Sequence, residues 1–185
     1  FSCKPPQELL GIDLNMPAQL ELIDAFQAFS DQVPFPQEQT ANFRYYFKNN
    51  MFLYCDAVTL YYVLRHFRPR QIIEIGSGFS SALMLDASDI YFDGGIGFTF
   101  VEPNPERLYS LLRDTDKQAS IITKPVQQID ATLFDKLDAN DFLFIYSSHV
   151  SKIGSDVNYL IFEILPRLKE GVIIHIHDIF YPFEM

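Results

Sequence analysis

A short glycine-containing loop is the first feature of the sequence that could bind a ligand. The loop reads Glu74-Ile75-Gly76-Ser77-Gly78 and leads into Phe79-Ser80-Ser81. Two glycines permit a tight turn and a close approach of a ligand to the backbone, and the predicted helix after them begins with unpaired N–H groups. The loop therefore suits a nucleoside with a polar tail. A simple turn between a strand and a helix would carry the same pattern, and that interpretation stays open at this point.

An acidic residue at the end of the next predicted strand favours the ligand-binding interpretation. The apolar run Phe98-Thr99-Phe100-Val101 is followed by Glu102 and Pro103. A carboxylate at such a strand end can accept hydrogen bonds from both hydroxyls of a ribose. A single glutamate is more often a solvated loop acid, but the glycine loop one strand earlier makes a nucleoside site the preferred interpretation.

The residue at position 81 separates classes of nucleoside ligand. A dinucleotide fingerprint has a third glycine there, where this sequence has Ser81. A serine side chain crowds the approach of the helix to the strand, so an NAD-dependent oxidoreductase is a disfavoured alternative. No Gly-Lys-Ser/Thr string follows the loop, which argues against phosphoryl transfer.

Three polar side chains late in the chain could move a proton. His149 follows the fourth predicted strand, and His177 and Asp178 end the fifth. Histidine titrates near neutral pH, and an open α/β sheet places its ligand crevice at the strand ends. His149 is therefore the first candidate for a general base, followed by His177 and Asp178. A purely structural role for each histidine is the alternative.

The elements that must position these residues form an alternating pattern after Pro69. Short apolar runs alternate with helical segments, which predicts a doubly wound α/β fold with a mainly parallel sheet. The predicted strands are Gln71 to Ile75, Gly97 to Val101, Ser120 to Thr123, Phe142 to Tyr146 and Val172 to His177. The predicted helices between them are Ser80 to Ala87, Pro105 to Asp114, Val126 to Lys136 and Asp156 to Leu168.

The N-terminal part is predicted to be a helical cap or lid over residues 1–68, with the α/β core over residues 69–185 in one structural domain. Helices are expected over Pro17 to Gln32, over Ala41 to Phe47, and from an N-cap at Asp56 to Phe67. An aromatic cluster either packs as a plain cap or folds over the crevice and lines an acceptor pocket. Its members are Tyr45, Tyr46, Phe47, Phe52 and Tyr54.

Composition narrows the classes of partner. The chain has 185 residues, with 24 acidic and 14 basic side chains and a net charge of -10. This charge repels phosphate backbones and anionic lipids, so neither nucleic acid nor a membrane is the expected partner. Cys3 and Cys55 have no zinc-site spacing and form no disulfide framework. The N-terminus lacks a signal-peptide pattern, so a cytoplasmic protein is expected.

Several of these strings together resemble the class I S-adenosylmethionine-dependent methyltransferases, which have a Rossmann-like fold. They are Glu74 to Gly78, Glu102, Ser147-Ser148-His149 and His177-Asp178. More narrowly, the chain resembles a bacterial family known mainly by its fold, with Gly-Ser-Gly-Phe-Ser-Ser and Ser-Ser-His-Val strings. The resemblance covers the chain from about Gly11 to Glu184.

The resemblance implies S-adenosylmethionine as cofactor. By it, Glu74 and the backbone from Gly76 to Ser80 hold the methionine moiety, Glu102 holds the ribose, and Val126 and Gln127 lie near the adenine. The residues expected to contact the cofactor are Glu74, Gly76, Ser77, Gly78, Ser80, Ser81, Glu102, Pro103, Val126, Gln127, Tyr146 and Ser147. The expected activity is methyl transfer to a small-molecule acceptor, with oxygen preferred by analogy alone.

Two departures from the family pattern qualify this expectation. Tyr146 stands where the family's fourth strand ends in an aspartate. A phenol is neutral at pH 7 and is no usual ligand of a divalent ion, so a divalent cation is not favoured and no metal ligand is assigned. A cofactor-binding domain with weak or no catalysis is the alternative. The fold usually continues past the fifth strand, so a sheet truncated there is expected, with an open edge at which copies of the chain could associate.

Overall fold

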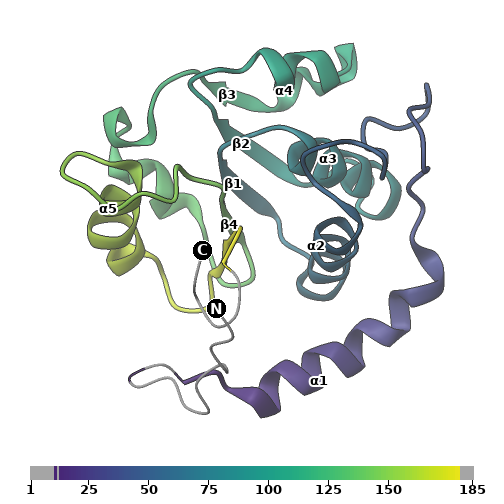
Figure 1. The fold of residues 1–185 in the computed structure, drawn as a ribbon, viewed down its shortest axis with the longest axis horizontal. Coiled ribbons are helices and arrows are strands. Elements are labelled where there is room, and N and C mark those ends of the chain that lie inside the picture. Colours follow the sequence, from purple (N-terminus) through teal and green to yellow (C-terminus); the bar gives the residue numbers. More distant parts are fainter. Residues whose placement is uncertain (1–10, 12, 180–185) are drawn as a thin grey trace, which may run out of the picture.

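The structure is a computed structural model that describes Gly11 and residues 13–179. It is a three-layer α/β arrangement in which one sheet runs through the middle (Figure 1). Helices α2 and α3 cover one face of the sheet, and α5 lies on the other. Cys3 lies outside the described residues, and Cys55 is exposed.

All five strands of the sheet are parallel, as predicted. They are β1 (Gln71–Ile75), β2 (Gly97–Val101), β3 (Ser120–Ile122), β4 (Phe142–Ile145) and β5 (Ile173–Ile176). Their order is β3-β2-β1-β4-β5, so the direction of winding reverses between β1 and β4. The central strands are apolar on both faces because helices cover both sides. The doubly wound fold is confirmed, and β5 is an edge of the described sheet.

Helices connect and flank these strands. They are α1 (Met16–Phe26), α2 (Tyr54–Phe67), α3 (Phe79–Tyr91), α4 (Glu106–Leu111) and α5 (Asp156–Tyr159). A 3₁₀ segment at Gln27–Gln32 extends α1, and π and 3₁₀ turns at Leu160–Ile164 and Leu165–Arg167 extend α5. Another 3₁₀ segment, Asp114–Gln118, precedes β3. No helix in the described part of the chain is long and apolar enough to cross a membrane.

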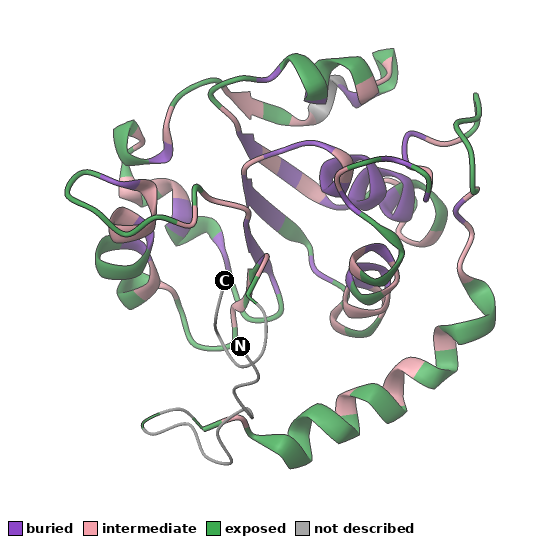
Figure 2. Ribbon diagram, in the orientation of Figure 1, coloured by how far each residue is buried: buried purple, intermediate pink, exposed green. Residues whose placement is uncertain are grey.

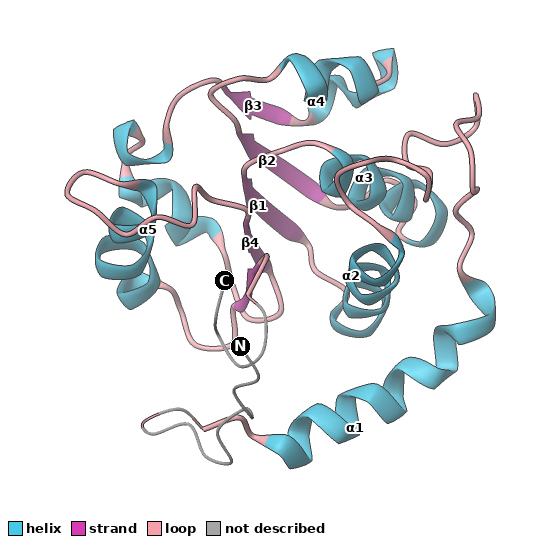
Figure 3. Cartoon of the chain, viewed as in Figure 1, coloured by secondary structure: helices cyan, strands magenta, loops and turns pink. Residues whose placement is uncertain are grey.

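The predicted helix from Ala41 to Phe47 is wrong. This segment is loop (Figure 3), with one antiparallel bridge between Thr40 and Phe43. Its backbone hydrogen bonds go elsewhere: the N–H of Phe47 donates to the Pro36 carbonyl at 2.9 Å, and the N–H of Tyr45 donates to a buried carboxylate on α3. Tertiary contacts therefore override the local preference for helix.

Two further details of the helices differ from prediction. Asp56 is not an N-cap, because α2 begins at Tyr54 and the Asp56 carboxylate accepts the N–H of Leu53 at 3.3 Å from within the first turn. The helix predicted from Val126 to Lys136 is instead two 3₁₀ segments, Val126–Gln128 and Ala131–Lys136. Asp130 separates them and caps the second by accepting the N–H of Thr132 at 2.9 Å.

The hydrophobic core joins the N-terminal segment to the sheet (Figure 2). Phe35, Tyr45 and Phe52 belong to the same buried cluster as Phe144 of β4. A second cluster, with Ile73 and Leu143, fills the opposite face. Of the aromatic cluster, Tyr54 is exposed, whereas Tyr45, Phe47 and Phe52 are buried. Helix α1 itself has no buried residue.

Candidate active site

Two adjoining cavities lie beyond the carboxyl ends of the strands, where the winding of the sheet reverses. The smaller has a volume of about 170 Å³ and the larger about 410 Å³. They share four lining residues, which are Gly76, Glu102, Tyr146 and Ser147. In an open α/β sheet this reversal point is where ligands bind. The predicted location of the site is therefore also where the described residues form cavities.

Gly76 lets strands β1 and β4 approach each other at this point. Its φ of 81° is in the region that favours glycine, and a Cβ on it would lie 2.0 Å from the carbonyl oxygen of Tyr146. The N–H of Tyr146 donates to the Ile75 carbonyl at 2.7 Å, which holds the two chains together. A side chain at position 76 would force them apart.

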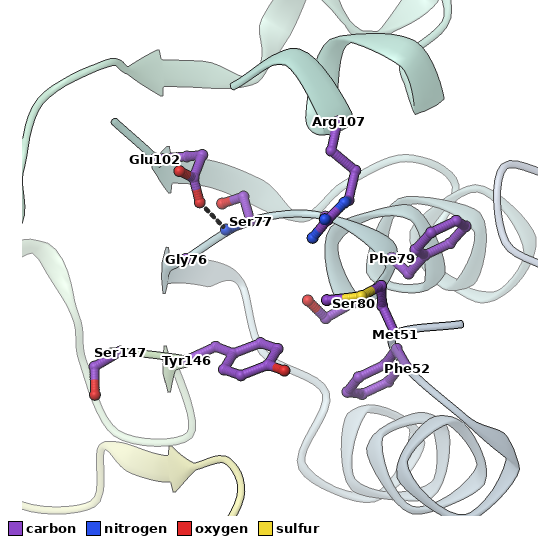
Figure 4. A pocket seen from close by; sticks show the side chains of 11 residues that line it. Met51, Phe52, Gly76, Ser77, Phe79, Ser80, Glu102, Arg107, Tyr146 and Ser147 are labelled. Atoms are coloured by element: carbon purple, nitrogen blue, oxygen red, sulfur yellow. Dashed lines mark hydrogen bonds between the residues drawn. The ribbon is translucent and has the colours of Figure 1, made fainter. Parts of the chain in front are cut away.

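Glu102 braces the same loop from the end of β2. Its carboxylate accepts the N–H of Ser77 at 2.9 Å (Figure 4). It also accepts the N–H of Asn104 at 2.8 Å. Because Glu102 lines both cavities, its oxygens also lie within reach of a ligand that spans them. A carboxylate in this position can accept hydrogen bonds from the hydroxyls of a sugar.

Glu74 and Ser81 lie beneath the loop and line neither cavity. Glu74 is fully buried and accepts hydrogen bonds from the hydroxyls of Ser80 and Ser81. The Ser81 hydroxyl also accepts the N–H of Gly78 at 2.9 Å. Burial raises the pKa of Glu74 to about 7, although the serine hydroxyls oppose this shift. The structure places Glu74 as an internal support for the loop rather than as a wall of a cavity.

The other residues expected to contact the cofactor are brought together. The smaller cavity is lined by Gly76, Ser77, Gly78, Ser80, Glu102, Tyr146 and Ser147. The larger cavity is lined by Pro103, Val126 and Gln127 in addition to the four shared residues. Three strand ends thus contribute to one continuous crevice.

Several lining residues were missed from the sequence. Met51 and Arg107 line the smaller cavity, and Lys152 and Asp156 line the larger one. Phe52, which also lines the smaller cavity, was not missed, because it belongs to the aromatic cluster for which a pocket wall was one of two interpretations. The sequence held no signal for Arg107, because an arginine on an exposed helix face is usually only solvated.

The three candidate proton-moving residues also lie together. Asp178 stands between two histidines, with one carboxylate oxygen 3.4 Å from Nε2 of His177 and the other 3.8 Å from Nε2 of His149. Tyr146 contacts both rings, with centroid distances of 4.6 Å to His177 and 5.7 Å to His149. None of the three lines either cavity, so Tyr146 connects them to the crevice.

Burial shifts the pKa values of two side chains next to this group, Tyr146 and His175. Burial and the nearby Asp178 carboxylate raise the pKa of Tyr146, so its phenol is uncharged at neutral pH. His175 stacks on Phe144 and lies 3.4 Å from His177, between Nε2 and Nδ1. Burial, helped by His177, lowers the pKa of His175 to about 4. No group of three His, Cys, Asp or Glu side chains in the described residues is arranged to hold a metal ion.

The fold is a Rossmann-like α/β domain with a crevice beyond the carboxyl ends of its strands. Residues 73–179 match the family described as a methyltransferase domain. The match covers more than half of the chain, which therefore belongs to the methyltransferase-domain family.

Two individual proteins show the extent of the similarity. An uncharacterized protein of Archaeoglobus fulgidus is 32% identical over 142 residues, which are 76% of this chain and 64% of that protein. The chain thus spans less than two thirds of this relative. The SAH-bound methyltransferase PaMTH1 of Podospora anserina aligns with 95% of this chain and 74% of its own, at 14% identity and a TM-score of 0.49.

Proposed function

We propose that this chain binds S-adenosylmethionine across the two cavities and transfers its methyl group to a small-molecule acceptor. The observation that carries the proposal is the pair of cavities that meet at Gly76 and Glu102, in a member of the methyltransferase-domain family. An elongated ligand with a flat ring, a sugar and a polar tail matches this sequence of compartments. The cofactor supplies a methyl group on a positively charged sulfur.

Each compartment suits one part of the cofactor. The larger cavity has apolar walls at Pro103 and Val126, which suit the adenine ring, with Gln127 at its rim. Glu102 at the junction suits the ribose hydroxyls. The smaller cavity, with the backbone of Gly76 to Ser80, suits the methionine moiety.

The acceptor is proposed to enter beside Met51, Phe52 and Tyr146, which form the apolar side of the smaller cavity. In this proposal the N-terminal part of the chain is a cap that completes the site. Positioning donor and acceptor supplies much of the acceleration of such a displacement. His149, with Asp178 beside it, is proposed as the general base for a hydroxyl acceptor, although the Tyr146 ring lies between it and the cavities. Oxygen is proposed as the methylated atom by analogy alone.

Binding is tested by titration calorimetry with S-adenosylmethionine, S-adenosylhomocysteine and NAD. The two sulfur nucleosides are expected to bind and NAD is not. Glu102→Ala is expected to weaken binding by about 1–3 kcal/mol, because ligand hydroxyls lose a charged acceptor. Glu106→Ala removes an equal charge from the exposed face of α4 and serves as the matched control, with unchanged affinity. Binding of NAD alone would overturn the proposal in favour of an oxidoreductase.

A cofactor-binding domain with weak catalysis is the second candidate, and a specific observation favours it. The neutral Tyr146 ring stands between the crevice and the two histidines. Tyr146→Asp is expected to raise methyl transfer to hydroxyl acceptors, measured as formation of S-adenosylhomocysteine, or to make it depend on a divalent ion. Tyr146→Phe is the control, since it keeps the ring without a charge. An unchanged rate and unchanged metal response in Tyr146→Asp would remove position 146 as the cause of weak catalysis.

A further inference from the structure

Arg107 brings an unpaired positive charge to the smaller cavity. It lies in the first turn of α4, and its guanidinium points toward the cavity (Figure 4). No carboxylate within the described residues forms an ion pair with it. Among the described lining residues of this cavity it is the only basic one. An unpaired cation at this cavity favours a ligand group of negative charge.

The glycine loop makes room for this side chain. A Cβ on Gly78 would lie 3.2 Å from Cδ of Arg107, which is a tight contact. The alkyl part of Arg107 therefore rests against bare backbone at Gly78. Leu108, fully buried beside it, fixes α4 against the core. The position of the guanidinium over the loop thus follows from packing on both sides.

The Ser77 hydroxyl does not add a second free donor to this cavity. Its oxygen is fully buried, and it lies close enough to the buried Glu74 carboxylate to oppose the rise in the pKa of that group. The guanidinium of Arg107 is therefore the charged donor among the described lining residues, and it suits an anionic oxygen group.

We propose that Arg107 binds the carboxylate at the amino-acid end of the cofactor. This inference rests on the proposed function. Arg107 lines only the smaller cavity, and the apolar compartment suited to the adenine ring lies on the other side of Glu102. The polar end of a ligand oriented in this way meets Arg107. A guanidinium presents paired N–H groups that match a carboxylate.

The test compares two ligands that differ only in the amino-acid end. S-adenosylhomocysteine carries it, whereas 5′-methylthioadenosine has the same adenosine and sulfur without it. Arg107→Met is expected to weaken S-adenosylhomocysteine about 10- to 100-fold, the value of a hydrogen bond to a charged group, and to change 5′-methylthioadenosine less than about twofold. Arg107→Lys is expected to retain part of the affinity. Arg70→Met, an exposed site before β1 at the opposite end of the sheet, is the charge-matched control.

Each outcome of the calorimetric titration separates the inference from the proposed function. Equal losses for both ligands would overturn the role of Arg107 in binding the carboxylate, as would an unchanged affinity for S-adenosylhomocysteine. In both of those cases the wild-type chain still binds adenosine ligands and the proposed function stands. If neither ligand binds the wild-type chain, the proposed function itself is wrong and this inference is overturned with it.

Discussion

Glu74 and Asp86 are both buried carboxylates, yet the protein satisfies them by different means. Glu74 is 0% exposed and accepts hydrogen bonds from the hydroxyls of Ser80 and Ser81, which follow closely in the chain. Asp86 is 2% exposed and accepts the guanidinium and the backbone N–H of Arg44, 42 residues earlier. The first is a local contact with neutral groups, and the second is an ion pair between distant segments.

The difference shows how two walls of the smaller cavity are held. Arg44 joins Asp86 of α3 to Asp116 and so fixes the N-terminal segment that continues to Met51 and Phe52. The glycine loop, in contrast, rests on a carboxylate without a cation. Since desolvation disfavours its charge, that support titrates near neutral pH. The cavity wall at Met51 and Phe52 therefore depends on an ion pair, whereas the wall formed by the glycine loop depends on the protonation of Glu74.

Breaking the ion pair is expected to have the largest effect on stability. Arg44→Met removes the guanidinium that bonds the buried Asp86 and Asp116 and leaves only Arg113, 3.9 Å from Asp86, which should lower the free energy of unfolding by about 3–5 kcal/mol. Urea unfolding at constant pH measures the loss. The segment around Arg44 and Tyr45 is also expected to become accessible to protease. The backbone N–H groups of these two residues bond to Asp86, whose position depends on the same ion pairs.

Arg167→Met is the matched control for that experiment. Arg167 pairs with Asp135 at 2.8 Å, but both side chains are substantially exposed. Exposed pairs contribute about 0–1 kcal/mol, so this variant should unfold almost as the wild type does. If Arg44→Met lowered the free energy of unfolding no more than Arg167→Met does, the ion pairs of Arg44 would not stabilise the segment that leads to Met51 and Phe52.

The same contrast between local and distant contacts explains which elements the sequence could predict. The strands were predictable because apolar runs such as Phe142 to Ile145 are buried on both faces. The glycine loop and Glu102 were predictable because local patterns specify them. The loop around Arg44 was not: its helical pattern is overridden by hydrogen bonds to Asp86, and no local signal reports a partner 42 residues away.

The residues of the candidate site also differ in how far the sequence could predict their positions. Residues next to a strand end, such as Gly76 and Tyr146, line the crevice because the end of a parallel strand fixes its own position. Arg107 and Met51 reach the cavity only because α4 and the segment before α2 pack beside it. The spacing of residues along the sequence does not reveal this packing. Glu74 was expected to touch the ligand, but its alternation in β1 directs it beneath the loop.

The smaller effect is a pH dependence that arises from Glu74. Its pKa is about 7 in the folded chain, against an ordinary value of 4.5, so the folded state binds the proton more tightly than the unfolded state. Between these pH values the contribution of Glu74 to stability falls as pH rises, by about 3 kcal/mol in total. Glu74→Gln mimics the protonated carboxyl and is expected to remove this loss.

The measurement is the free energy of unfolding of wild type and Glu74→Gln from pH 4.5 to 8 in urea. The difference between them is expected to grow in favour of the variant as pH rises through the window that ends at about 7. Glu170→Gln removes a carboxylate that is exposed in the folded chain and should run parallel to the wild type. A Glu74→Gln curve that also ran parallel would mean that Glu74 keeps its charge when buried. The glycine loop would then be supported by a charged carboxylate, as the segment around Arg44 is.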